Sequence, residues 1–154
     1  MKIGGDYMKK VLILLIMLIS FTSTVKADSD LSFAISAPSE VSTNDKTSII
    51  ISISSFNNTK GDIKTCNFKM TTTNELTNQE RSSALDNWTI SSSDTENITI
   101  STSDSPISSL TAVTKLINIS ANISDTTQIT ISNITCYGDN NQDDPYTAND
   151  ISAT

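Results

Sequence analysis

The sequence predicts an all-β protein, a sandwich or jelly roll of about eight or nine strands. Isoleucine alternates with small polar residues in several segments, which is the period of two expected of a half-buried strand. Clusters of Asn, Asp, Ser, Gly and Pro separate these segments. The one stretch with a weak helical pattern is residues 78–85. A chain of 154 residues has room for a single core of this kind.

The predicted strands follow one another from Leu31 onward. Residues 57–62 are typical of a hairpin-type loop, with Gly61 at the position most in need of a positive φ. Residues 72–87 are expected to form a long loop with one helical turn. The expected strands are residues 31–37, 48–56, 64–71, two short ones starting at 88 and 98, then 115–124, 129–136 and a last one beginning near 151.

The clearest strands lie within residues 112–139 and are expected to form a pair. The first strand places Ile, Ile, Ala and Ile at alternate positions from 117 to 123. The second continues the pattern from Ile129 after a turn at residues 125–127. The apolar alternation then slips by one residue at Ser132–Asn133, which predicts a β-bulge at this point.

Residues 1–27 resemble a secretory signal peptide, so the folded domain is expected to span residues 28–154. Lys9 and Lys10 form a basic start, an apolar run of 11 residues follows, and small residues mark a cleavage site. The alternative is a membrane anchor, but a spanning helix needs about 20 residues. We therefore expect an exported chain without membrane insertion. Its last strand looks unfinished at Thr154.

Charge and composition exclude several classes of function. From Asp28 onward, 16 acidic and 6 basic residues give a formal net charge of −10, which disfavours nucleic acid and anionic membranes as partners. The chain has no histidine, so Ser-His-Asp and Cys-His nucleophile systems and the usual zinc sites are excluded. The acidic residues fall mainly in predicted loops, which is a poor setting for the two facing carboxylates of a glycosidase. We expect no enzymatic activity.

Cys66 and Cys136 are the only cysteines, and both are in phase with inward-facing apolar neighbours. In an exported protein this pattern favours a disulfide, here one that joins the two sheets. Closing a loop of about 70 residues would add about 4 kcal/mol to the free energy of unfolding on the chain-entropy model. The alternative is two buried free thiols that behave as small hydrophobic side chains.

The acidic stretch before the last predicted strand is the strongest metal candidate. Asp139, Asn141, Asp143 and Asp150 occupy positions 1, 3, 5 and 12 of a calcium loop, and their oxygen atoms suit Ca²⁺. Asp144 stands where such a loop needs glycine, and a proline follows it. The alternative is an acidic hairpin without metal between the last two strands. No other cofactor is expected.

Three aromatic residues are candidates for stacking on sugar rings, as aromatic faces do in glycan-binding modules. These are Trp88, Tyr137 and Tyr146, and each is isolated in the sequence. The alternative is one tryptophan that fills the core and two loop tyrosines.

The order of short sequence words resembles the cohesin-like modules of bacterial extracellular proteins. After the export segment come APSEV, TSIIISI, IKTCNFKMTTTNEL, a lone Trp, and the closing words LINISANI and ITISNIT. The resemblance covers roughly residue 31 to the end. It implies a β-sandwich with jelly-roll, immunoglobulin-like topology, related in fold to several carbohydrate-binding modules.

The resemblance also implies a function, because cohesins bind a calcium-loaded dockerin on one sheet face. The matching face would be the polar sides of two predicted strands, with Asn67 and Lys69 on one and Asn118, Ser120 and Asn122 on the other. We therefore expect a secreted or cell-surface binding module from a bacterium. It would dock a dockerin-bearing protein or bind carbohydrate in extracellular polysaccharide degradation. The alternative is a structural or adhesion module without a small ligand, and the oligomeric state stays open.

Overall fold

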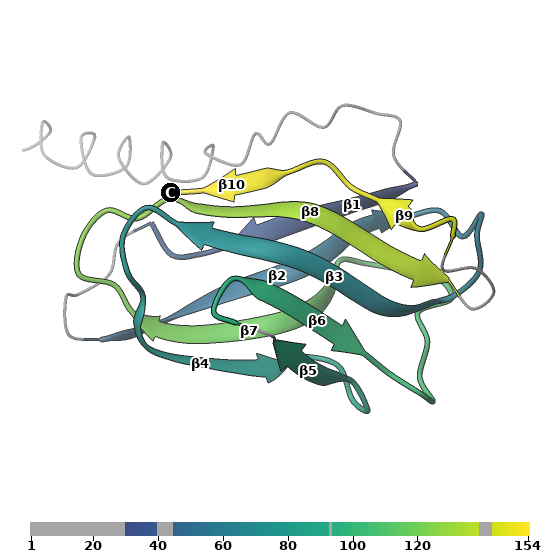
Figure 1. The fold of residues 1–154 in the computed structure, drawn as a ribbon, viewed down its shortest axis with the longest axis horizontal. Coiled ribbons are helices and arrows are strands. Elements are labelled where there is room, and N and C mark those ends of the chain that lie inside the picture. Colours follow the sequence, from purple (N-terminus) through teal and green to yellow (C-terminus); the bar gives the residue numbers. More distant parts are fainter. Residues whose placement is uncertain (1–29, 40–44, 93, 139–142) are drawn as a thin grey trace, which may run out of the picture.

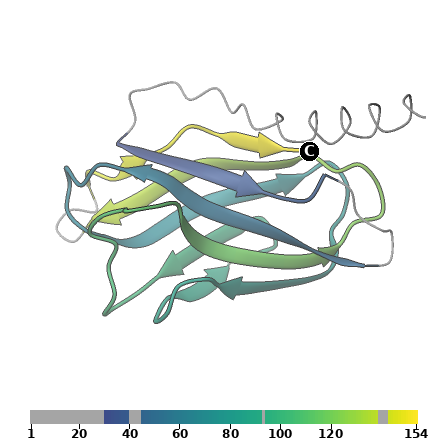
Figure 2. The same ribbon diagram turned by 180° about the vertical axis from the view of Figure 1, so that it is seen from behind.

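The protein is described by a computed structural model that covers residues 30–39, 45–92, 94–138 and 143–154. The expected signal peptide lies outside these residues. All regular structure in the described part is β-strand, and the strands form two sheets packed face to face (Figures 1 and 2). The predicted two-sheet sandwich is therefore confirmed. No helix among the described residues has the length and apolarity needed to cross a bilayer.

The two sheets contain ten strands in the described residues, slightly more than predicted. The four-stranded sheet has the order β1-β2-β7-β4, and the six-stranded sheet has the order β10-β8-β3-β6-β5 with β9 also paired to β8. The strands are β1 (Leu31–Ser36), β2 (Lys46–Phe56), β3 (Ile63–Thr72), β4 (Thr77–Ser83), β5 (Thr89–Ser92), β6 (Asn97–Ser101), β7 (Thr114–Asn122), β8 (Ile129–Gly138), β9 (Tyr146–Thr147) and β10 (Ile151–Ala153).

The core lies between the sheets and is built mainly of isoleucine. Because successive side chains of a strand point to opposite faces, the alternation read from the sequence places one apolar set of each strand inward. Ile117 and Ile119 of β7 and Ile98 and Ile100 of β6 are at most 1% exposed. Phe33 and Phe68 meet edge to face across the core, with ring centroids 6.1 Å apart.

The predicted bulge in β8 is confirmed. Asn67 of β3 pairs with Thr135, whereas Lys69, two residues further on, pairs with Ser132, so β8 carries one extra residue. Asn133 takes up this residue with a φ of 53°. The bulge reverses the in–out alternation, and this is why Ile134 continues the apolar face of the strand.

Two predicted connections are wrong, because pairing between strands is not encoded locally. The loop at 57–62 does not close a hairpin, since β2 belongs to the four-stranded sheet and β3 to the six-stranded sheet. The strands of 112–139 likewise belong to different sheets, so β7 and β8 do not pair with each other. Gly61 does have the positive φ expected of it, at 96°.

The helical turn predicted within residues 72–87 is also wrong, because residues 77–83 form strand β4 at the edge of the four-stranded sheet. The strand is polar on both sides, so it lacks the alternation that marks the others. Pairing with β7 orders it. Arg81 links β4 to the turn before β6, because its guanidinium donates a hydrogen bond to the carbonyl oxygen of Thr95. It also donates to Gln79 Oε1 within β4. Burial lowers the pKa of Arg81.

Candidate functional site

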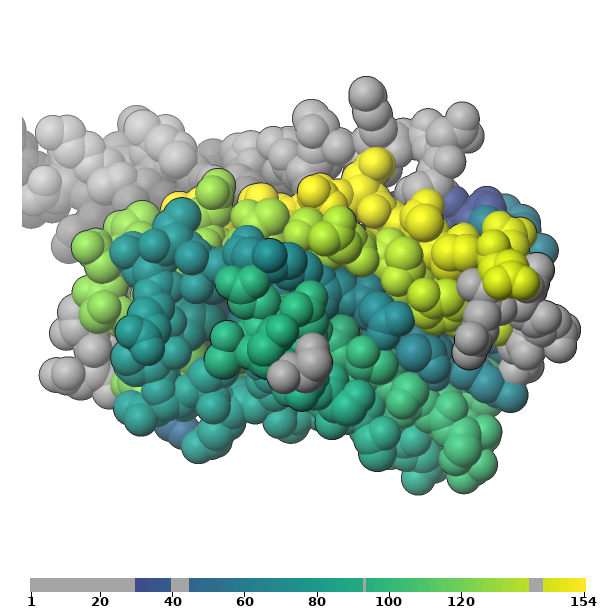
Figure 3. Space-filling view, viewed as in Figure 1, coloured from purple at the N-terminus to yellow at the C-terminus, as the bar shows by residue number. Residues whose placement is uncertain are grey.

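The outer surface of the six-stranded sheet consists mainly of hydroxyl and amide groups and is here called the six-strand face. Figure 3 shows it toward the viewer, as a continuous surface built by β8, β3 and β6. Side chains that alternate with the buried ones on β3, β5, β6 and β8 form it. They are Thr65, Asn67, Lys69, Thr71, Thr89, Ser91, Asn97, Thr99, Ser101, Thr130, Ser132, Thr135 and Tyr137.

Lys69 is the only charged residue among these side chains, and Glu96 neutralises it. Its Nζ lies 3.0 Å from Oε2 of Glu96, in the turn between β5 and β6. Asp94 organises this turn, because its Oδ1 accepts hydrogen bonds from the backbone N–H groups of Asn97 at 2.6 Å and Glu96 at 2.8 Å. The bonds from Asn97 and Glu96 hold the pKa of Asp94 below its ordinary value.

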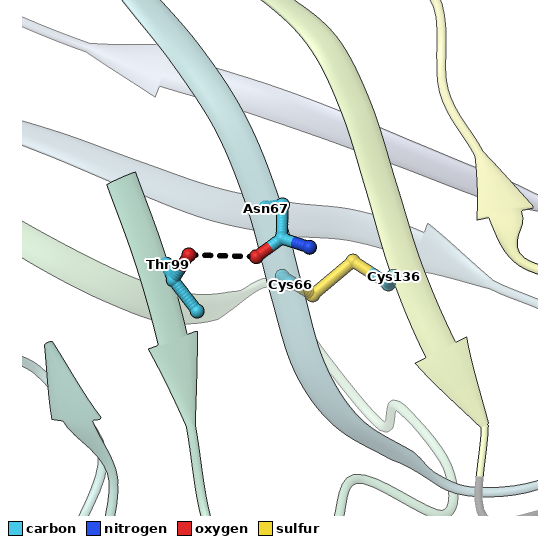
Figure 4. The surroundings of a disulfide bond; sticks show 4 residues. All are labelled: Cys66, Asn67, Thr99 and Cys136. Carbon is cyan, nitrogen blue, oxygen red and sulfur yellow. Dashed lines mark hydrogen bonds between the residues drawn. A yellow bond between two sulfur atoms is a disulfide. The ribbon is translucent and has the colours of Figure 1, made fainter. Parts of the chain in front are cut away.

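Cys66 and Cys136 form a disulfide directly beneath the six-strand face. The two residues are register partners on β3 and β8, their Cα atoms are 4.0 Å apart, and both side chains are fully buried. The bond therefore links neighbouring strands of one sheet, and the expectation that it joins the two sheets is wrong. Figure 4 shows the bond on one side of the sheet and the Asn67 side chain on the other.

The residues above this disulfide form two rows across β3 and β8. Thr65 pairs with Tyr137, and Asn67 pairs with Thr135, while the disulfide pair lies between these rows and points inward. Oδ1 of Asn67 accepts a hydrogen bond from the Thr99 hydroxyl at 2.8 Å, as Figure 4 shows. The amide nitrogen of Asn67 points away from Thr99, toward β8. We call Thr65, Asn67, Thr135 and Tyr137 the β3–β8 platform.

The outer surface of the four-stranded sheet, the four-strand face, has polar side chains that are tied to one another. Lys46 of β2 forms an ion pair with Glu80 of β4. The hydroxyl of Ser48 donates a hydrogen bond to Oδ1 of Asn118 on β7 at 2.5 Å. At these two contacts the polar groups of the four-strand face already bond within the protein.

The single binding face predicted from the sequence does not exist, because its residues lie on opposite outer surfaces. Asn67 and Lys69 belong to β3 in the six-stranded sheet, whereas Asn118, Ser120 and Asn122 belong to β7 in the four-stranded sheet. The prediction correctly placed each side chain on the polar side of its strand. It failed because it assumed that the two strands shared a sheet.

Of the four predicted calcium ligands, Asp143 and Asp150 lie within the described residues. Asp139 and Asn141 lie outside them. The chain from Asp143 to Asp150 runs alongside β8, because β9 within it pairs with β8. Oδ1 of Asp150 accepts a hydrogen bond from the backbone N–H of Asn133 at 3.3 Å, so this carboxylate serves the bulge. Among the described residues no cluster of three or more His, Cys, Asp or Glu could hold a metal, and calcium binding stays a prediction.

Of the three aromatic candidates, two are core residues. Trp88 is 5% exposed and donates its indole N–H to the carbonyl oxygen of Ser105 at 2.8 Å. Tyr146 is 1% exposed, and its hydroxyl donates to the carbonyl oxygen of Gly61 at 2.8 Å. Only Tyr137 lies on an outer surface, and it is half-buried there.

The surface of the described residues includes two hollows. A groove of about 460 Å³ lies at the end of the sandwich that holds Thr154, with Pro38, Ile123 and Ile129 among its lining residues. A smaller hollow of about 210 Å³ lies beside β4 and includes Glu75 and Glu96. Glu96 is already paired with Lys69. Neither hollow contains a cysteine, and the chain has no histidine.

Comparison with solved structures identifies the fold as cohesin-like. The chain is similar to a cohesin module from a family 33 glycoside hydrolase of Clostridium perfringens, with a TM-score of 0.62 and 14% sequence identity. The match covers 82% of this chain and 95% of the other. No protein-family model matches the sequence, and neither does any curated protein. At this identity the likeness shows the fold alone.

Proposed function

We propose that the protein is an exported, non-catalytic docking module that binds a protein partner on the six-strand face. The observation that carries the proposal is the cohesin-like fold over most of the chain. Cohesins dock dockerins through one sheet face, so a dockerin-type module is the partner that the family resemblance favours. Carbohydrate, the other ligand class expected from the sequence, is considered separately below.

The six-strand face suits a partner better than the four-strand face does. Charged residues are depleted at the centres of protein interfaces, and Lys69 on this face is neutralised by Glu96. On the four-strand face, Ser48 and Asn118 already bond to each other, and a partner would have to replace that contact. Beneath the six-strand face the disulfide holds two of its strands together. These strands are already ordered before a partner binds, which reduces the entropic cost of binding.

Export is supported by the disulfide as well as by the N-terminal segment. Disulfides persist in oxidising compartments and are rare in the reducing cytosol. The bond between Cys66 and Cys136 is fully buried, so it is part of the folded core. We propose a secreted or surface-attached bacterial protein, in line with the family resemblance.

Charge reversal on each face tests the proposal. Lys69→Glu and Lys46→Glu are a matched pair, because both replace a partly exposed lysine that is ion-paired on an outer sheet surface. Immobilised protein should retain dockerin-type proteins from the secreted fraction of the source organism. Lys69→Glu should weaken this retention by about tenfold or more, because it would leave two unpaired carboxylates on the face, that of Glu96 and the introduced one, and burying unpaired charge in an interface is costly. Lys46→Glu should leave it unchanged.

Two results would contradict the docking proposal. One is the retention of no secreted protein by the folded wild-type chain. The other is an equal loss of retention with both variants, which would show that the six-strand face has no special role. Circular dichroism of both variants checks that each is still folded.

A further inference from the structure

The β3–β8 platform has unused hydrogen-bonding groups. In the described residues, the side chains of Thr65, Thr135 and Tyr137 have no hydrogen-bond partner. Asn67 uses its carbonyl oxygen to accept from Thr99, and its amide nitrogen has no partner among the residues that the structure describes. Three hydroxyl groups and one amide donor are therefore open toward solvent within a small area.

The platform is compact enough for one ring of a ligand. Side chains of directly paired residues are about 5 Å apart, and residues two apart on a strand are about 7 Å apart. Thr65 and Tyr137 form one pair, and Asn67 and Thr135 form the other. The tyrosine ring thus has two threonine hydroxyls and one amide as its immediate neighbours on the sheet.

We infer that the β3–β8 platform binds one ring of a neutral saccharide, with the ring stacked on Tyr137. A sugar ring has an apolar face for an aromatic side chain and hydroxyl groups at its edge for hydrogen bonds. The platform provides both kinds of contact. None of its four residues is charged, so it has no group to recognise a sugar carboxylate or phosphate.

The disulfide holds the platform in its binding geometry. Its two half-cystines occupy the register positions between the Thr65–Tyr137 row and the Asn67–Thr135 row. Residues on either side of a cross-linked pair cannot shift relative to each other without breaking that link. The platform is therefore preorganised, which reduces the entropy that a weakly binding sugar has to overcome.

This saccharide site goes beyond the proposed docking function and does not depend on it. Both ligands would use the six-strand face, so a polysaccharide bound at the platform would compete with a docked protein. Saccharide binding is tested with purified carbohydrates alone.

The test is affinity electrophoresis and calorimetry of the full chain with soluble neutral polysaccharides, namely xylan, glucomannan and mixed-linkage β-glucan, and with polygalacturonate as the charged control. We expect at least one neutral polymer to bind and polygalacturonate not to bind. Tyr137→Ala should weaken binding by about tenfold, because it removes the stacking surface. Tyr137→Phe keeps the ring and should weaken it less. Asn67→Ala should also weaken binding, and Asn118→Ala on the four-strand face should not.

Several outcomes would overturn the inference. Absence of binding to every neutral polymer by folded wild-type protein would do so and would leave the docking proposal untouched. Equal binding by wild type and Tyr137→Ala would show that any sugar site lies elsewhere. Loss of protein retention in Tyr137→Ala, together with no binding of any polysaccharide, would assign Tyr137 to the protein interface instead.

Discussion

The two sheets bury similar isoleucine-rich inner faces, yet their outer faces are organised differently. On the four-strand face, polar side chains satisfy one another, as in the Lys46–Glu80 ion pair and the Ser48–Asn118 hydrogen bond. On the six-strand face, the hydroxyls of the β3–β8 platform have no partner within the part of the chain that the structure describes, and a disulfide lies beneath them. Similar packing requirements in the core thus leave the outer side chains of the two sheets free to differ. The disulfide and, among the described residues, the unpaired hydroxyls of the platform distinguish the region that we assign to binding.

The largest expected effect comes from removing the disulfide within the six-stranded sheet. The double change Cys66→Ala and Cys136→Ala should lower the free energy of unfolding by about 4 kcal/mol, because it frees a loop of about 70 residues in the unfolded chain. Urea denaturation measures this loss. Amide hydrogen exchange should increase more in β3 and β8 than in β2 and β7. A loss of unfolding free energy below about 1 kcal/mol, or equal hydrogen exchange in both sheets, would show that the disulfide does not account for the difference between them.

A smaller effect is expected at two asparagines that occupy equivalent irregularities, one in each sheet. Asn133 has a φ of 53° at the bulge in β8, and Asn78 has a φ of 50° at the irregular pairing of β4 with β7. Replacing either by Ala should cost about 1 kcal/mol of unfolding free energy, and replacing either by Gly should cost less, because only glycine adopts a positive φ without steric strain. Chemical denaturation of the four variants measures this.

The same pair of asparagines separates stability from binding. Asn133→Ala disturbs the bulge that sets the orientation of Thr135 and Tyr137, so it should also weaken binding on the six-strand face. Asn78→Ala should destabilise the fold to a similar degree without changing binding. If both variants weakened binding equally, the bulge would have no specific role in shaping the face.

The smallest expected effect is a pH dependence confined to the rim of the six-strand face. Hydrogen bonds from Asn97 and Glu96 lower the pKa of Asp94, so its contribution to stability is present above the ordinary carboxyl pKa and is lost as the pH falls through the lowered value. Asp94→Ala should therefore be slightly less stable than wild type near neutral pH. The difference between their urea midpoints should shrink as the pH falls below about 4. A difference that did not change with pH would mean that the charge of Asp94 is not involved.

Much of the architecture could be predicted from the local alternation of apolar and polar residues. The alternation around Ile117 and Ile98 located strands, and the phase slip at Ser132–Asn133 located a bulge, because each depends only on which side of a strand a residue occupies. Both cysteines were placed inward for the same reason. Strand β4 was missed because an exposed edge strand buries too little to need an apolar pattern.

The local alternation could not predict which strands share a sheet. The candidate site depended on that pairing of distant strands. The polar residues of β3 and β7 show the same alternation, and nothing in it indicates that the strands belong to different sheets. The expected binding face was therefore divided between two surfaces. The platform was missed for the same reason, since Tyr137 was visible in the sequence but its neighbours Thr65 and Asn67 lie about 70 positions away.

The cross-link between neighbouring strands also sets how the molecule would respond to tension. If its ends were pulled apart, the residues before Cys66 and after Cys136 could unravel, but the loop between them would stay closed by the covalent bond. Such a loop contributes nothing to the extended length until the bond is reduced. A pulling experiment under oxidising conditions should therefore stop short by about 230 Å, the length of roughly 70 extended residues, and recover that length once reductant is added.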